Sequence, residues 1–507
     1  MYRVSFSLFG ACLLFCGIAA FATDCPNDPA RPTIATADAS VKTAEGAEPA
    51  TATADAANPP ANVEAASIKF TFEERIRNED WNNIEDFNSA NDDERRQVRY
   101  RTRARLKYGS APVDFVVGLN DEFNKKYALK PADIKADRLN MDEVILEYLY
   151  LNIKKLPVPG LSLSVGRQDI MRGEGFLFFD GSSGDGSRTQ YFNAASINYQ
   201  HAKSKIELLG ILDPKLDRFF GIIHDQKKYL NEWDEQGVGA YYTNRNHKNT
   251  DWDVYYFYKK EINDYRAKTN YQFQPNRGVN TLGGRLVERL PEGWSITAEY
   301  AGQWGNQHAN PYAVPAGQTA ATGQSAEDIR AWGGFGYVKK TFATAWKPYI
   351  QVGFWGFSGD DPNNKKTLKG FDPLFSRWPK WSELYLYSLV FERGVAYWTN
   401  NMLEQVEVGA TPVKGLNLRA TVYEEKAFHP FQPFQTNTSQ LHFGTGTHRG
   451  ENYQVLADHT FNEHWRAHIL YENFSPGDFY KYQPDSFFFR AQVNWTVTKN
   501  LINFHKH

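Results

Sequence analysis

The chain has 507 residues, 41% of them hydrophobic and 23% charged, and its net charge is −2. This composition excludes an intrinsically disordered protein and a bundle of membrane helices, and the near-neutral charge gives no bulk attraction to nucleic acid. Aromatic residues reach 15% and the mean hydropathy is −0.58, a combination that favours a large β structure in which half of the side chains meet water.

Residues 1–22 have the pattern of a secretory signal peptide. Arg3 precedes the apolar run from Leu8 to Ala22, which ends on the small-residue triplet Ala20-Phe21-Ala22. The run is too short to cross a bilayer as a helix, so a membrane anchor is the weaker alternative. We therefore expect export from the cytoplasm.

Residues 23–66 form a low-complexity segment dominated by Ala, Thr, Glu, Asp and Pro, without aromatic residues. Such a segment cannot bury enough apolar surface to offset the entropy lost on ordering. The sequence predicts a flexible periplasmic linker over 23–66 and a folded domain over 67–507.

From residue 67 onward the hydrophobic pattern has a period of two. In the stretch from Val98 to Tyr108, apolar and semi-polar residues alternate with five cations. Because successive side chains of a strand point to opposite faces, one face is apolar and the other carries a column of positive charge.

About 18 such segments are predicted, and the links between them alternate in length. Their centres lie near residues 72, 102, 118, 148, 164, 197, 208, 240, 255, 285, 298, 334, 352, 406, 420, 456, 468 and 491. Short links such as 109–112 and 290–293 alternate with long polar links such as 123–142 and 358–399, and we place the strand-like run Leu384 to Phe391 inside the last of these. Short turns on one side and long loops on the other are typical of outer-membrane barrels. The sequence thus predicts an all-β, transmembrane, up-and-down antiparallel barrel in the outer membrane of a Gram-negative-type bacterium.

The same alternation predicts which charged residues face the interior of the barrel, its lumen. The predicted inward cations are Arg99, Arg101, Arg103, Arg105, Lys107, Arg285, Arg289, Arg419, Arg466 and Arg490. Inward acids are also predicted, so one interpretation is a lumen of mutually paired charges. The other is a lumen that binds an anion, because like charges spaced two residues apart repel unless something anionic offsets them. Arginine binds carboxylates bidentately, so an anionic polymer would suit this column.

The segment from Leu163 to Ile170, followed by a glycine-rich loop from Gly173 to Gly186 and by Arg188, resembles the alginate-export family of outer-membrane porins. The resemblance implies a monomeric barrel of 18 strands with an arginine-rich constriction that passes anionic alginate outward. The residues that match this constriction are the Arg99–Arg105 column and Arg167, with Asp169 as the nearest acid.

Motifs for catalysis, cofactors and metals are weak. Asp180 and Asp185 in the glycine-rich loop could hold a calcium ion but lack the remaining acids of an EF-hand, so a flexible loop is the better interpretation. We expect no enzyme activity, no cofactor and no metal.

The leading functional hypothesis is passive export of an anionic, alginate-like exopolysaccharide through an arginine-lined lumen. The alternatives are a porin for uptake of small anionic solutes, and a barrel enzyme or surface-binding protein that works through its outer loops. The expected partners are the polysaccharide, outer-membrane lipid and periplasmic secretion components, with no nucleic acid.

Overall fold

The structure of the protein is a computed structural model. It describes residues 66–84, 86–91, 93–127, 139–141, 144–179, 191–217, 221–223, 234–262, 276–307, 327–361, 364, 366–376, 381–384, 399–430 and 443–503. Within these ranges the chain is almost entirely β structure, with one 3-10 turn at Pro291–Gly293. No helix in the described ranges is long and apolar enough to cross a membrane.

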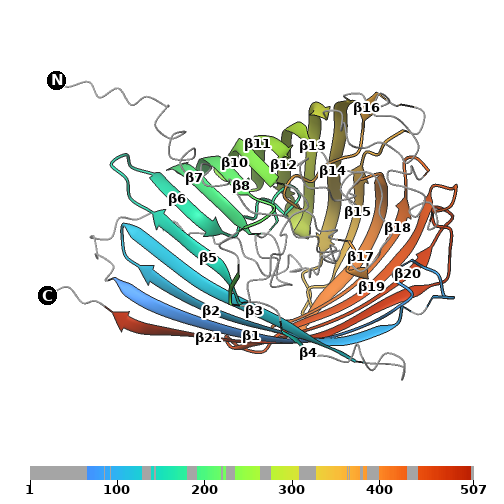
Figure 1. Ribbon diagram of the computed structural model, residues 1–507, viewed down its shortest axis with the longest axis horizontal. Helices are drawn as coiled ribbons and strands as arrows, with labels where there is room; N and C mark the ends of the chain where they lie inside the picture. Colours follow the sequence, from blue (N-terminus) through green and yellow to red (C-terminus); the bar gives the residue numbers. More distant parts are fainter. Residues whose placement is uncertain are drawn as a thin grey trace, which may run out of the picture. The chain divides into compact units, whose positions relative to one another are not determined.

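Eighteen long strands form one closed antiparallel sheet. The strands are β1 (Ser67–Asn82), β2 (Arg95–Gly109), β3 (Val113–Tyr127), β5 (Val144–Ile153), β6 (Leu161–Gln168), β7 (Phe192–His201), β8 (Ser204–Asp213), β10 (Asp234–Asn244), β11 (Thr250–Ile262), β12 (Arg277–Arg289), β13 (Trp294–Gln307), β14 (Glu327–Thr341), β15 (Tyr349–Phe357), β17 (Asn401–Val413), β18 (Leu416–Lys426), β19 (His448–Thr460), β20 (Trp465–Pro476) and β21 (Ser486–Asn503). Each long strand pairs with the next, and β21 pairs with β1, so the sheet closes on itself. Figure 1 shows this seam, with β21 in red beside β1 in blue. The predicted fold class is confirmed.

Three short strands sit at the edges of this barrel wall. The strand β4 (Leu139–Met141) pairs with β3, β9 (Gly221–Ile223) pairs with β5, and β16 (Thr367–Leu368) pairs in parallel with β14. They lie in long links and do not cross the barrel, so they leave the alternation of short and long links unchanged.

Every predicted strand centre falls inside a long strand, but several strands are longer than expected. The predicted centres near residues 72 and 102 lie in strands of 16 and 15 residues, since β1 continues to Asn82 and β2 begins at Arg95. The reason is that Arg77 and Glu79 form part of a buried charge network and stay in the ladder. Of the strand-like run from Leu384 to Phe391, only Leu384 is described, and it is buried; 385–391 lie outside the described residues.

The two faces of the wall differ as the alternation predicts. On β1 the side chain of Arg75 is fully buried, whereas its neighbour Ile76 is 48% exposed on the outer face. The same contrast holds on β2 between Arg101 and Leu106. Apolar side chains thus cover the outside, where lipid requires them, and charged side chains fill the lumen.

Two segments from long links fold back into the barrel and pack together. Residues 169–179 follow β6, and residues 366–376 lie between β15 and β17. An isolated parallel bridge joins Phe178 to Phe375. These two segments, called the plug segments below, belong to the hydrophobic core that fills part of the lumen.

Candidate functional site

The arginine column of β2 is matched by carboxylates on adjacent strands. Arg101 pairs with Glu73 of β1 at 2.6 Å, and Arg103 pairs with Glu147 of β5 at 2.6 Å. Arg99 pairs with Glu122 of β3 and lies 3.6 Å from a carboxylate oxygen of β1. The column has no acid on its own strand, but neighbouring strands supply the anions that offset its repulsion. Arg99, Arg101 and Arg103 are therefore paired with carboxylates of the chain, which is the first of the two interpretations of the lumen given above.

Apart from Arg105, the other predicted lumen cations also meet acids of the chain. These pairs are Lys107–Asp114 at 3.3 Å, Arg285–Glu174 at 3.4 Å, Arg289–Asp251 at 2.6 Å, Arg419–Glu407 at 3.7 Å, Arg466–Asp458 at 3.2 Å, Arg490–Glu79 at 2.9 Å and Arg167–Asp217. They are spread around the whole barrel, so the structure does not bring the predicted residues together into one site. Arg167 also lies 4.4 Å above the ring of Tyr191, deep in the wall.

A polar cavity of about 530 Å³ lies in the half of the lumen next to the short turns. We call it the vestibule. Its lining comes from Arg105, Tyr148, Tyr150, Asn152, Ser162, Ser164, Gln168, Asp169, Arg172, Ser196, Asn198, Gln200, Lys205 and Glu207. In outer-membrane barrels the short turns face the periplasm, so the vestibule is on the periplasmic side.

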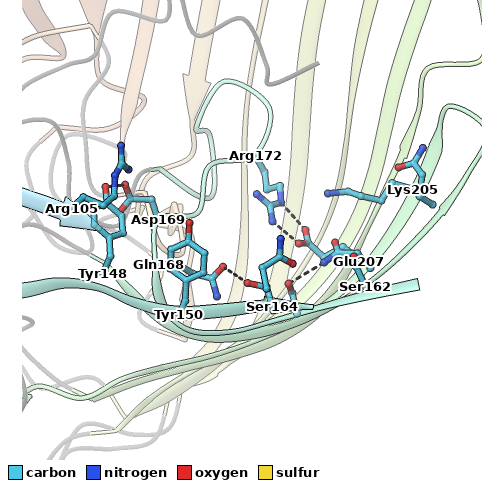
Figure 2. A pocket seen from close by; sticks show the side chains of 14 residues that line it. Arg105, Tyr148, Tyr150, Ser162, Ser164, Gln168, Asp169, Arg172, Lys205 and Glu207 are labelled. Carbon is cyan, nitrogen blue, oxygen red and sulfur yellow. Dashed lines mark hydrogen bonds and ion pairs between the residues drawn. The ribbon is translucent and has the colours of Figure 1, made fainter. Parts of the chain in front are cut away.

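The charges of the vestibule are only partly compensated. Arg172 donates two hydrogen bonds to the carboxylate of Glu207, at 2.7 and 2.5 Å, and Asp169 accepts one from the hydroxyl of Tyr148 at 2.6 Å. Arg105 and Lys205 form no ion pair with any residue that the structure describes. Figure 2 shows them at opposite ends of the lining. The vestibule therefore offers two cations to an incoming anion.

Arg105 owes its position to a glycine on the neighbouring strand. Gly118 lies between Arg105 and Tyr148 in the cross-strand register. A Cβ on Gly118 would come within 2.7 Å of the Tyr148 ring, so only glycine leaves room for that ring in its present position. The ring in turn lies 5.4 Å from the Arg105 guanidinium, a cation–π contact that leaves the edge of the guanidinium available.

Aromatic packing joins the two plug segments inside the lumen beyond the vestibule. The rings of Phe178 and Phe375 stack at 5.3 Å, and those of Phe176 and Phe371 stack at 5.4 Å. The hydroxyl of Ser376 donates to the carbonyl of Gly175 at 2.6 Å. Each buried phenyl ring stabilises the contact by about 1.5–3 kcal/mol, so the two segments hold together firmly.

Charged side chains fasten the plug segments to the wall. Asp372 pairs with Arg277 of β12 at 2.6 Å and lies 3.7 Å from Lys259 of β11. Glu174 accepts a hydrogen bond from the hydroxyl of Tyr337 on β14 at 2.7 Å. Because Asp372, Arg277 and Lys259 are buried, removing one of them would leave a charge without full compensation.

No group of three or more His, Cys, Asp or Glu side chains is suited to hold a metal ion in the ranges that the structure covers. The calcium candidates Asp180 and Asp185 lie outside the described residues. The chemistry that the vestibule offers is non-covalent recognition by cations, tyrosines, amides and hydroxyls.

Sequence reasoning missed several vestibule residues for identifiable reasons. Lys205 lies two residues before Glu207 on β8, so the alternation of the strand predicts that both side chains point into the lumen. Tyr148 could not be found this way, because a register shift between Gly118 and Leu119 turns both Glu147 and Tyr148 into the lumen. Arg172 lies in a plug segment, where no periodic pattern applies.

Comparison with known proteins agrees with this architecture. A family model described as alginate export matches residues 66–494 of the chain. A search of curated proteins found no match to this chain. Among solved structures, Acinetobacter baumannii OccAB4 has a TM-score of 0.50 at 11% identity, covering 87% of this chain and 100% of its own. Pseudomonas aeruginosa OpdL has a TM-score of 0.49 at 12% identity, covering 85% and 99%. The outer membrane protein OpdK of Pseudomonas aeruginosa has a TM-score of 0.48 at 14% identity, also covering 85% and 99%. At these identities the likeness concerns the fold alone.

Proposed function

Because this chain belongs to the alginate export family and is an outer-membrane β-barrel channel, we propose that it exports an anionic, alginate-like polysaccharide from the periplasm. The observation that carries the proposal is that Arg105 and Lys205, on the periplasmic side of the lumen, form no ion pair with any residue that the structure describes. A polymer of uronic acids carries regularly spaced carboxylates, and such groups are the natural partners of a guanidinium and an ammonium.

In this proposal the two halves of the lumen have different tasks. The vestibule receives the polymer, and the plug segments 169–179 and 366–376 must move aside before it can pass outward. Arg99, Arg101 and Arg103 mainly hold the wall together through their carboxylate partners. Transport runs down the concentration gradient of the polymer, without a cofactor, and the channel has no catalytic task.

The remaining expectations about the chain belong to the same proposal. Residues 1–22 direct export and are removed, and residues 23–66 form a periplasmic linker ahead of the barrel domain, 67–507. The barrel works as a monomer surrounded by lipid, and periplasmic secretion components deliver the polymer to it.

Planar-bilayer recording tests the proposal. The wild-type channel should prefer anions, and oligouronates added on the periplasmic side should block its current. The double variant Arg105→Gln with Lys205→Gln should lose most of this preference. The control is Arg330→Gln, since Arg330 is exposed on the wall and has no place in the vestibule. A cation-selective wild-type channel, or polymer secretion that persists after deletion of the gene, would contradict the proposal.

Uptake of small anions is the second candidate function. It is favoured by the volume of the vestibule, about 530 Å³, because pockets for small ligands span about 300–1,000 Å³. Uptake predicts that deletion slows growth on a small organic acid while polymer secretion continues, which is the reverse of the result expected for export.

A further inference from the structure

The floor of the vestibule is built from neutral polar side chains on adjacent strands. Ser162 of β6 lies opposite Asn198 of β7, and Ser164 of β6 lies between Asn152 of β5 and Ser196 of β7 in the register. These hydroxyl and amide groups form a continuous patch across the strands. A patch of this kind can donate and accept hydrogen bonds at several neighbouring points.

One end of this floor is aromatic. Tyr148 and Tyr150 lie with their ring centroids 6.5 Å apart in an edge-to-face arrangement. Close beside Tyr150, Gly166 has a φ of +126°, and a Cβ there would come within 2.7 Å of the Tyr150 backbone. Gly118 and Gly166 thus allow both tyrosines to lie close against the wall, and Figure 2 shows them beside Gln168.

We propose that this floor is a saccharide-binding subsite that holds a short stretch of an acidic polysaccharide before the plug opens. The inference rests on the proposed function and adds the place and the chemistry of recognition. Tyr150 offers a ring to a sugar face, Arg105 and Lys205 bind sugar carboxylates, and the serines and amides of the floor bind sugar hydroxyls. Sugars are amphipathic, so a site that combines an aromatic ring with closely spaced polar groups suits them.

Tyr148 is a positioning residue in this subsite. Its hydroxyl donates to Asp169 at 2.6 Å, which fixes the ring, and the fixed ring supports the guanidinium of Arg105 from one face. A guanidinium held in this way keeps its planar donor edge directed toward a ligand and loses less entropy on binding. The pair Arg172–Glu207 completes the wall without adding net charge.

The position of the plug explains why binding should come before passage. Asp169 and Arg172 line the vestibule, and the plug segment that they begin continues into the aromatic contact between Phe178 and Phe375. A saccharide that enters from the periplasmic side therefore meets the floor first and the plug second. The subsite would hold the polymer end in line with the closed part of the lumen.

Isothermal titration calorimetry with the purified full barrel in detergent tests the inference. The probes are a mannuronate tetrasaccharide and, as a neutral control, maltotetraose. We expect the acidic tetrasaccharide to bind and maltotetraose to bind at least about tenfold more weakly, because maltotetraose lacks the carboxylates that form charge-assisted hydrogen bonds with Arg105 and Lys205. Arg105→Gln and Tyr150→Ala should each weaken binding of the acidic probe about tenfold, while Arg330→Gln should leave it unchanged.

A variant away from the ligand separates positioning from contact. Gly118→Val should push the Tyr148 ring aside and weaken binding about as much as Arg105→Gln does, although residue 118 touches no sugar. Heat-modifiable migration on a gel should show that the variant barrel is folded. If folded Gly118→Val, Arg105→Gln and Tyr150→Ala barrels all bind the acidic probe like the wild type, the subsite inference is wrong.

The same measurements distinguish this failure from a failure of the proposed function. Unchanged binding in the variants, together with anion selectivity and polymer secretion that depends on the gene, would reject the subsite and leave the export function intact. Tight binding that the variants abolish, together with secretion that does not depend on the gene, would reject the export function and leave the subsite intact.

Discussion

Arg490 on the last strand and Glu79 on the first strand form a 2.9 Å ion pair across the seam that closes the barrel, and neither side chain is exposed. The Glu79 carboxylate also accepts a hydrogen bond from Gln97 at 2.9 Å, and Arg99 lies 3.6 Å away. One carboxylate thus serves several donors from three strands at the point where the sheet must meet itself. The seam is therefore held by charge as well as by the ladder.

Replacing Glu79 by Gln should destabilise the barrel strongly. The change leaves Arg490 without one of its two carboxylate partners and removes the charge shared with Arg99. Breaking a buried pair costs about 3–5 kcal/mol, so the free energy of unfolding should fall by that order. The free energy of unfolding is measured by following, as urea is increased, the fraction of barrel that migrates as the folded form on a gel run in the cold. Glu404→Gln is the control, because Glu404 is exposed, and equal midpoints for the two variants would contradict the prediction.

Replacing Glu74 by Leu should make the barrel more stable in lipid. Glu74 and Ile76 are two residues apart on β1, so both side chains lie on the outer face. Glu74 pairs in register with Thr102 of β2, whose hydroxyl donates a hydrogen bond to the Glu74 carboxylate at 2.6 Å. A carboxylate on the lipid face is unfavourable, so its removal should raise the free energy of unfolding by about 1 kcal/mol. Unfolding in phospholipid vesicles checks the sign, with Ile76→Leu as the neutral control. A less stable Glu74→Leu barrel would show that the carboxylate has a favourable role on that face.

Replacing Asp372 by Ala should loosen the plug and raise the conductance. The change removes the partner of Arg277 at 2.6 Å and of Lys259 at 3.7 Å. Without this fastening the segment 366–376 should leave the lumen more often, and the mean single-channel conductance should rise about twofold or more. Asp251→Ala removes a paired carboxylate near a short turn and should change the conductance little. Equal conductance in wild type and Asp372→Ala would show that aromatic packing alone keeps the plug in place.

Binding of acidic oligosaccharides should weaken as salt rises. Arg105 and Lys205 face the water of the vestibule, so added ions screen their attraction for a carboxylate. Raising the salt from 0.05 to 0.5 M should weaken binding by about tenfold in calorimetry, since the screening length falls from about 14 to about 4 Å. Maltotetraose, without charge, should show no such trend. Salt-independent binding of the acidic probe would assign the recognition to hydrogen bonds and the tyrosines instead.

The sequence predicts the barrel well because a period of two is a property of each strand alone. The inward positions of Arg99, Arg101 and Arg103 follow from it directly, as do the outward Ile76 and Leu106. The partners of those arginines do not, because they depend on the register between strands. A carboxylate such as Glu147 reaches Arg103 only through the particular alignment of β2, β3 and β5.

The plug and the vestibule are the parts that sequence reasoning could not reach. Phe176 and Phe178 are recognisable as apolar residues in a polar link, but their partner Phe375 comes from another link far along the chain. The vestibule depends on the bulge near Gly118, which breaks the parity that every other prediction used. In both cases local patterns fail because the interaction is set by three-dimensional alignment.

The contact between Phe178 and Phe375 also bears on how the barrel is assembled. Eight long strands, from β7 to β15, lie between the two segments that supply these rings. The plug can form only after all eight have taken their places, so an incompletely inserted barrel would be an open hole in the cell envelope. The plug contact thus depends on the strands up to β15, and factors that delay insertion of these strands should leave bacteria more permeable to detergents and large antibiotics.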